Sequence, residues 1–281
     1  MGPIDGLTIR PVGPEAAAEG LALTVETNWN QTAEDWAFFI SYGTVFGARD
    51  AASRLVATAA LLPYSAGFAW IGLVIVAQPH RGRGLGTRML NECIAALCER
   101  ALSGMLDATP TGAQVYALLG FKPIMGLQRW AGAGGGIGVR AERVRLFATS
   151  DVQRIARVDS GAFGADRETL LADYCARVGT RGFELADGSG YALVRLGRVA
   201  SQLGPVVAGS ARDATVLLEA AIAATPGSIF IDVPDAWTEV AVWLGARGFA
   251  VQRPFVRMAL GRDAPFGDPA RVFAIAGPEY G

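Results

Sequence analysis

Cysteine and histidine are scarce in this sequence, and their scarcity argues against several kinds of site. The three cysteines, Cys93, Cys98 and Cys175, are an odd number and none of them forms a Cys-x-x-Cys pair. This pattern predicts a reduced, disulfide-free protein of the cytoplasm. His80 is the only histidine. A single histidine without a cysteine pair argues against a zinc site, so we expect no metal.

Long runs of one charge and long apolar runs are also missing. The formal net charge is −1 at pH 7, and no block of Lys or Arg occurs, so the charge pattern gives no support for nucleic acid or a membrane surface as a partner. The longest apolar run, residues 67–77, is about half of the 20 residues that a membrane-spanning helix needs. Because 51% of the residues are hydrophobic and 18% are charged, we expect a well-filled core.

The most informative segment present is Arg-Gly-Arg-Gly-Leu-Gly at residues 81–86. It follows the apolar run and opens a helical pattern that continues to about residue 102, which is the order strand, glycine-rich turn, helix. Such a turn directs backbone N–H groups outward, and the helix N-terminus adds a partial positive charge. The segment therefore predicts a pyrophosphate site. It matches neither the full Gly-x-Gly-x-x-Gly pattern nor a Walker motif.

A second glycine-rich stretch, residues 131–138, predicts a linker or long turn, because glycine orders at a large entropic cost. The expected division is residues 1–131, a linker at 132–138, and residues 139–281. In the first part, the residue patterns predict strands at 7–12, 44–49, 54–64, 67–77, 103–108 and 121–130. They predict helices at 14–27, 32–42, 85–102 and 112–119, the second of them capped by Thr32 with Asp35 at the third helical position.

The second half of the chain repeats parts of the first half. The segment 105–110, which contains Asp107, is echoed by 230–234, which contains Asp232, and 116–121 is echoed by 243–249. Where the first half has the glycine turn, the second half has Ser-Ala-Arg-Asp-Ala-Thr at 210–215. That segment lacks glycine and carries an acidic side chain, so it suits a phosphate poorly. We infer an internal duplication in which only the first copy kept the anion site.

Together, the strand, the Arg-Gly-x-Gly-x-Gly turn, the helix, the next strand and helix, and a Tyr-x-x-x-Gly-Phe segment resemble the GCN5-related N-acetyltransferase (GNAT) family. Arg81, Gly84 and Gly86 occupy the defining places of that family's loop motif. The chain also resembles a bacterial subgroup with a second, degenerate acetyltransferase-like domain, through segments 29–32, 106–110, 163–167, 203–208 and 276–280.

The resemblance implies an α/β (α+β) fold with tandem GNAT-like domains, each a twisted mixed β-sheet flanked by helices. In that fold two strands splay apart and admit the pantetheine arm of acetyl-CoA. The resemblance implies that backbone groups of Val74, Ile75 and Val76 pair with this arm, and that a backbone N–H near Val76 polarises the thioester carbonyl. It also implies that the pyrophosphate lies against the loop formed by Arg81, Gly82, Arg83, Gly84, Leu85, Gly86 and Thr87.

Acetyl transfer to an amine needs an acid and a base. An alkyl amine has a pKa near 10, so it must lose a proton before it attacks, and the departing thiolate must gain one. The family usually supplies the acid from a tyrosine, which here is Tyr116. Asp107 is a candidate base, although its position favours a cap for the turn before Pro110. Glu26, Trp29 and Asn30 are candidates for binding the acceptor, and a water chain that ends at a carboxylate is an alternative base.

These expectations define a cytoplasmic N-acetyltransferase that transfers an acetyl group from acetyl-CoA to a primary amine. The amine belongs to a small molecule or a peptide, and transfer is by direct attack in a ternary complex. The second half would close one side of the acceptor pocket, and a homodimer is possible. The alternatives are an acyltransferase that uses another acyl-CoA and a non-catalytic acyl-CoA sensor.

Overall fold

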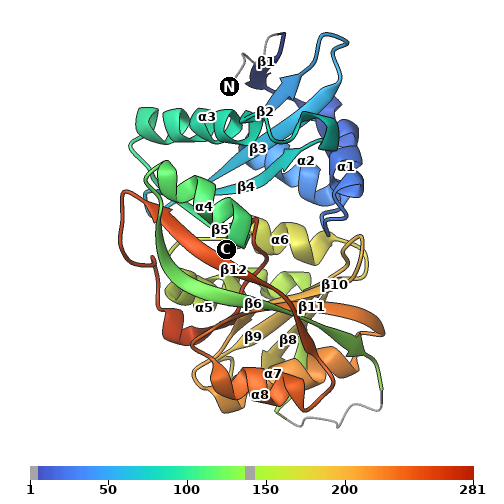
Figure 1. Cartoon of the computed structure of the whole chain (residues 1–281). Helices are drawn as coiled ribbons and strands as arrows, with labels where there is room; N and C mark the ends of the chain where they lie inside the picture. Colours follow the sequence, from blue (N-terminus) through green and yellow to red (C-terminus); the bar gives the residue numbers. More distant parts are fainter. Residues whose placement is uncertain (1–5, 137–142) are drawn as a thin grey trace.

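One mixed sheet runs through the whole molecule, and helices cover both of its faces (Figure 1). The computed structural model describes residues 6–136 and 143–281. Among these residues the order of neighbouring strands is β1-β2-β3-β4-β5-β12-β6-β11-β10-β9-β8-β7, and β13 pairs with β10. Parallel pairing joins β4 to β5 and β10 to β11, and the other neighbours are antiparallel. The predicted α/β fold class is confirmed, with the difference that the strands form one continuous sheet and not one sheet for each domain.

The elements follow the predicted order of the first half closely and repeat it in the second. The strands are β1 Thr8–Pro11, β2 Thr44–Arg49, β3 Leu55–Tyr64, β4 Phe68–Val76, β5 Ser103–Ala108, β6 Lys122–Gly134, β7 Val144–Phe147, β8 Arg181–Leu185, β9 Tyr191–Arg195, β10 Ser201–Val207, β11 Gly227–Pro234, β12 Ala250–Leu260 and β13 Val272–Ala274. The helices are α1 Ala17–Glu26, α2 Ala33–Tyr42, α3 Leu85–Glu99, α4 Pro110–Leu118, α5 Val152–Phe163, α6 Glu168–Ala176, α7 Ala211–Ala223 and α8 Thr238–Gly245.

The two halves exchange one strand each at the centre of the sheet. After α4, β6 runs into the second half and pairs with β11 from Leu127 to Gly134. After α8, β12 runs back between β5 and β6, and residues Val256–Leu260 pair with β5. Neither half therefore holds a complete sheet of its own. We propose two domains with a boundary after β6. These domains correspond to the two copies of the repeat and not to two separate sheets.

The predicted linker at 132–138 is wrong over residues 132–134, which belong to β6. A side chain at Gly132 would meet the ring of Phe249, and one at Gly134 would meet the backbone oxygen of Thr225 at 2.4 Å. Glycine is present there because neighbouring elements approach the strand closely, not because the chain needs freedom. Residues 137 and 138 of the predicted linker lie outside the described residues.

The exchange brings the duplicated aspartates against arginines of the other copy. Asp107 on β5 binds Arg257 on β12, with Oδ1 and Oδ2 at 2.8 and 2.9 Å from Nε and Nη2. Asp232 on β11 binds Arg129 on β6 in the same bidentate way, with both distances 2.7 Å. Each copy has a Gly-Phe pair, at residues 120–121 and 248–249, and each arginine stands eight residues after the phenylalanine of its own copy. Two repeat-related ion pairs therefore tie the exchanged strands together.

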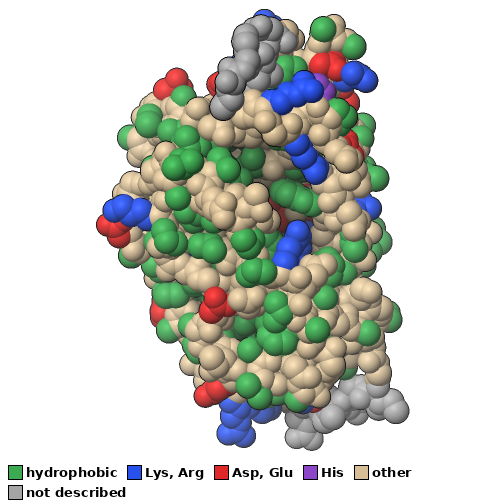
Figure 2. Space-filling view, in the orientation of Figure 1, with side chains coloured by type: hydrophobic (Ala, Val, Ile, Leu, Met, Phe, Trp, Pro, Cys, Tyr) green, Lys and Arg blue, Asp and Glu red, His purple; other side chains and the backbone are tan. Residues whose placement is uncertain are grey.

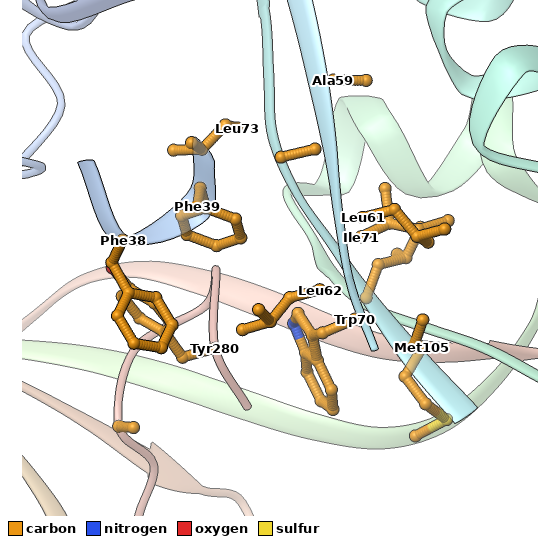
Figure 3. Close-up of a cluster of buried hydrophobic side chains, with 14 of the residues drawn as sticks. Phe38, Phe39, Ala59, Leu61, Leu62, Trp70, Ile71, Leu73, Met105 and Tyr280 are labelled. Atoms are coloured by element: carbon orange, nitrogen blue, oxygen red, sulfur yellow. The ribbon is translucent and has the colours of Figure 1, made fainter. Parts of the chain in front are cut away.

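Residues 276–281 run through the middle of the molecule and complete its core. Tyr280 is fully buried beside Phe38 and Phe39 of α2, and the rings of Phe39 and Tyr280 stack at 4.9 Å (Figure 3). The Tyr280 hydroxyl donates to Asp35 at 2.8 Å. Asp35 also closes the predicted capping box with Thr32, which is confirmed. This packing places Glu279, the neighbour of Tyr280, beside β4.

Candidate active site

The N-terminus of α3 is open, as an anion site requires. Gly84 is its N-cap, with a left-handed φ of 79°, and no side chain caps the helix. Its counterpart in the second half, α7, is closed. Ser210 accepts a hydrogen bond from the backbone N–H of Asp213, and the Asp213 carboxylate binds Arg143. Among the described residues, no side chain thus caps the first helix turn in the first copy, whereas Ser210 caps it in the second.

Strands β4 and β5 separate beside this helix end. They pair only between Phe68–Trp70 and 103–105. Beyond Trp70, β4 carries a bulge, where its register against β3 shifts and Leu73 takes a φ of 50°. The Thr58 hydroxyl donates to the Leu73 carbonyl at 2.8 Å and holds the bulge in place. The splayed strands expose backbone of β4 on the side that faces away from β3.

A groove joins the open helix end to the splayed strands, and we call it the α3 groove. It is lined by Glu26, Thr27, Trp29, Val74–Val76, Gln78, His80–Gly82, Gly84–Thr87, Thr109, Thr111, Gly112, Val115 and Tyr116. The structure thus brings together nine of the ten residues predicted to hold the coenzyme. The tenth, Arg83, is exposed and does not line the groove. Arg81 is fixed there by a hydrogen bond from Nε to the Val76 carbonyl at 2.8 Å.

A second, more enclosed cavity adjoins the α3 groove where the two halves meet, and we call it the junction pocket. Its lining comprises Trp29–Gln31, Ile71–Val74, Leu106–Thr109, Tyr116, Arg129, Arg253, Phe255, Pro278 and Glu279. Tyr116, Trp29, Val74 and Thr109 line both spaces. Figure 2 shows Lys or Arg side chains on both sides of a hollow in the middle of this face.

Tyr116 stands on α4 at the border between the two spaces. Burial is the main reason that its pKa rises to about 12, and Cys93 adds a smaller effect. At neutral pH the hydroxyl is therefore protonated and able to donate a proton. Its position on the shared wall agrees with the predicted role, which stays a prediction.

Asp107 does not offer a free carboxylate to the junction pocket. Both of its oxygens are held by Arg257, and its side chain is fully buried. It does not cap the turn before Pro110 either, because the Thr109 hydroxyl accepts the hydrogen bond from Gly112 N–H at 3.2 Å. The structure thus favours a structural role for Asp107 over the predicted catalytic one.

Two of the predicted acceptor-binding residues are used elsewhere. Asn30 binds the loop before β10. Its Oδ1 accepts from Val199 and Ala200 N–H at 2.9 and 3.0 Å, and its Nδ2 donates to the Ala200 carbonyl. Glu26 accepts from Gln78 N–H at 2.6 Å on the α3 groove, outside the junction pocket. Of the three, only Trp29 keeps a side chain available to both spaces.

The sequence analysis predicted that the second half closes one side of the acceptor pocket, but it missed the residues that do so. Arg253 and Phe255 reach it from the exchanged strand β12, and Glu279 reaches it from the segment after β13. Glu279 accepts from Arg195 Nη2 at 2.9 Å. Burial raises the pKa of Glu279, and the opposing effect of Arg195 does not cancel that rise. The sequence offered one signal for this contribution. The residue of the first copy that is equivalent to Arg253 is Met125, so the repeat does not explain an arginine at this position.

The described parts of the chain contain no cluster of three His, Cys, Asp or Glu side chains that could hold a metal ion. None of the helices in residues 6–136 and 143–281 is long and apolar enough to cross a membrane.

A sheet with splayed central strands, a bulge and an open helix N-terminus agrees with the fold of an acetyltransferase domain. Models of the acetyltransferase (GNAT) domain match residues 41–123 and, separately, residues 155–274. The chain therefore belongs to the GNAT family as a tandem member, and it is an acyltransferase.

Known proteins resemble the chain over most of its length. It is 26% identical to YitH of Bacillus subtilis, an uncharacterized N-acetyltransferase, over 82% of this chain and 83% of that protein. It is 25% identical to holothin acyltransferase of a Pseudoalteromonas strain, over 80% and 78%. A candidate acetyltransferase from Pyrococcus horikoshii shares the fold, with a TM-score of 0.84, 23% identity, and 100% and 98% coverage. So does a tandem GNAT protein of the clavulanic acid pathway, with a TM-score of 0.63, 16% identity, and 90% and 98% coverage.

Proposed function

We propose that the protein transfers an acetyl group from acetyl-CoA to the primary amine of a small molecule or peptide, by direct attack in a ternary complex. The observation that carries this proposal is the pair of joined spaces with Tyr116 on their common wall. The α3 groove suits the coenzyme, because its open helix end suits a diphosphate and its splayed strand suits the pantetheine amides. The junction pocket suits the acceptor, and residues 253, 255, 278 and 279 of the second half close one side of it.

The proposed reaction needs three proton movements. The protonated amine first gives one proton to a base, and its nitrogen then attacks the thioester carbonyl, so that a C–N bond forms and the C–S bond breaks. The departing thiolate takes a proton from the Tyr116 hydroxyl, and the second proton that the nitrogen loses as the amide forms returns to Tyr116. The products are the acetamide and free coenzyme A. A backbone N–H of β4, near Val76, would stabilise the charge that develops on the carbonyl oxygen.

We propose Glu279 as the group that receives the proton of the amine. It lines the junction pocket, and burial raises the pKa of its carboxyl, which makes it a stronger base than an ordinary glutamate. Asp107 is less suitable because Arg257 occupies both of its oxygens. The base would then come from the second half of the chain and the acid from the first.

Replacing Glu279 by glutamine should change the pH profile of the reaction. A base acts only when it is ionised, so kcat/KM of the wild type should fall as the pH drops through the pKa of Glu279. Because burial raises that pKa, the fall should begin above the usual range of a glutamate. E279Q should lose this acidic limb and run at least about tenfold slower on the plateau. An unchanged profile would assign the base elsewhere.

A negative charge placed at the open helix end should weaken binding of the coenzyme. Gly86 is suitable for this test, because a Cβ there would meet only the Val76 side chain, at 3.7 Å. A glutamate in the first turn of a helix also stabilises it, so the fold should persist. G86E should raise the Kd for acetyl-CoA by about tenfold or more relative to G86Q, which has the same shape without the charge. Calorimetry would measure both, and equal Kd values would place the diphosphate elsewhere.

The function is tested by release of free thiol from acetyl-CoA over a panel of primary amines. The proposal predicts release with at least one amine, together with formation of the acetamide. Release with longer acyl-CoA donors but not with acetyl-CoA would make the protein another acyltransferase. Coenzyme binding without release from any donor would make it a sensor.

A further inference from the structure

The junction pocket holds one charged side chain that forms no ion pair within the described residues. Asp107 is paired with Arg257, Arg129 with Asp232, and Glu279 with Arg195, all within 3 Å. Arg253 lines the same pocket, and within the described residues its guanidinium makes no hydrogen bond and no ion pair. The pocket therefore carries an uncompensated positive charge on its β12 side.

A second arginine lies close to Arg253. Arg253 and Arg129 lie against the same ring, with their guanidinium carbons 5.1 and 5.3 Å from the centre of Phe255. Burial, with a further contribution from Arg129, lowers the pKa of Arg253, and the opposing effects of Asp232 and Glu279 do not cancel that fall. The Nε of Arg253 is shielded from solvent and has no acceptor in the structure. A buried donor of this kind is costly when it is unpaired, so the arrangement calls for an anion from outside the chain.

A second polar atom in the pocket also lacks a partner. Gln31 is only 7% exposed, and its Oε1 is buried without a hydrogen-bond donor among the described residues. It reaches the pocket from the segment before α2, whereas Arg253 reaches it from β12. One wall thus offers an acceptor for an N–H group, and another wall offers a cation.

The repeat shows that this arginine is not required by the strand itself. Counted from the Gly-Phe pair, the residue of β6 equivalent to Arg253 is Met125. By contrast, both copies have an arginine at the position of Arg257, which is Arg129 in the first copy. Each of these arginines holds an aspartate of the neighbouring strand. The strand geometry therefore accepts an apolar residue at this position.

We propose that the acceptor is an amino-carboxylate: its carboxylate binds Arg253, and its amine is oriented by Gln31 toward the thioester. This inference rests on the proposed function and narrows the acceptor class. The apolar lining that includes Leu106 and Phe255 would contact the carbon chain between the two groups.

The test compares amines that differ only in the carboxylate. The pairs are β-alanine with propylamine, 4-aminobutyrate with butylamine, and 6-aminohexanoate with hexylamine, each assayed for thiol release from acetyl-CoA. The members of a pair have amines of similar basicity, so the ratio of their kcat/KM values reports recognition of the carboxylate. We expect the carboxylate member of the best-fitting pair to be preferred by about tenfold or more.

The variant R253M carries the residue of the equivalent position. It should lower kcat/KM for the preferred amino-carboxylate by about ten- to a hundredfold, mainly through KM, and change that of the matched alkylamine by less than about twofold. R253K should keep part of the preference. R212M, on the exposed start of α7, is the matched control and should change neither value.

Four outcomes would count against the inference. Equal use of both members of every pair, or equal loss with both members in R253M, would overturn it while leaving the acetyltransferase proposal intact. Absence of thiol release with all six amines and with the wider amine panel would overturn the proposed function itself. If R253M does not fold, inhibition of the wild-type protein by acetamide products tests the inference in its place. N-acetyl-β-alanine should inhibit and N-propylacetamide should not, and equal inhibition by both would contradict the inference.

Discussion

Replacing Tyr116 by phenylalanine should lower kcat by about two orders of magnitude. A positioned general acid contributes about 10²- to 10⁴-fold. We expect the lower end of this range, because a thiol has a pKa near 8.5 and its thiolate leaves comparatively easily. The pKa of Tyr116 is raised to about 12 by burial, so the hydroxyl stays protonated throughout the neutral range. The measurement is steady-state thiol release with saturating acetyl-CoA.

The control for this prediction is the affinity for the coenzyme. The lost hydroxyl acts on the leaving group, so the Kd for acetyl-CoA in Y116F should stay within about twofold of the wild type. The acidic limb that we assign to Glu279 should also keep its midpoint. Y42F, which alters a tyrosine that is 54% exposed on α2, should run at the wild-type rate. If Y116F turns over like the wild type, the thiolate takes its proton from another group.

Removing the carboxylate of Asp232 should destabilise the protein by about 3–5 kcal/mol, because it leaves the Arg129 guanidinium buried without a counter-ion. Arg129 is 3% exposed and Asp232 is fully buried. Asp232 also accepts from Gln202 Nε2 at 2.9 Å. The free energy of unfolding of D232A in urea would show the loss. The pair also joins the exchanged β6 to β11, so its loss weakens the contact between the two halves.

Two further variants make this result specific. D263A removes the partner of Lys122 from an ion pair whose side chains are 68% and 74% exposed, and it should cost less than about 1 kcal/mol. Adding R129M to D232A removes the stranded charge and should recover much of the stability. A D232A protein as stable as D263A would mean that the pair does not hold the exchanged strands.

Much of the first half could be predicted from the sequence, because its signals are local. Hydrophobic periodicity predicts α3, the Thr32–Asp35 capping box predicts the start of α2, and the order of strands β2 to β5 follows the apolar runs. The glycine turn before α3 is also local, since a left-handed N-cap needs glycine. These features depend on residues that are close in sequence.

The exchange of β6 and β12 could not be predicted, because no local signal tells a strand which copy to join. Gly132 and Gly134 have the composition of a flexible linker, and only the contacting Phe249 and Thr225 explain them. The two bidentate pairs span 150 and 103 residues of sequence. The repeated spacing from Gly-Phe to arginine was the available hint. It becomes informative only once the aspartates of the other copy are seen beside it.

The candidate site also has one part that local sequence signals predict and one part that depends on contacts between the two halves. The α3 groove is built almost wholly from one copy, and nine of its ten predicted residues line it. The junction pocket depends on Arg253, Phe255 and Glu279, which reach it through the strand exchange and the buried final segment. Asp107 and Asn30 are plausible by sequence position, yet distant partners hold both side chains.

The central claim is that one copy of the repeat holds an acyl-CoA at the open end of α3, while the capped end of α7 holds none. Calorimetric titration of the wild-type protein with acetyl-CoA tests this most directly. The account predicts one molecule bound per chain. No measurable uptake, or uptake of two molecules per chain, would contradict it.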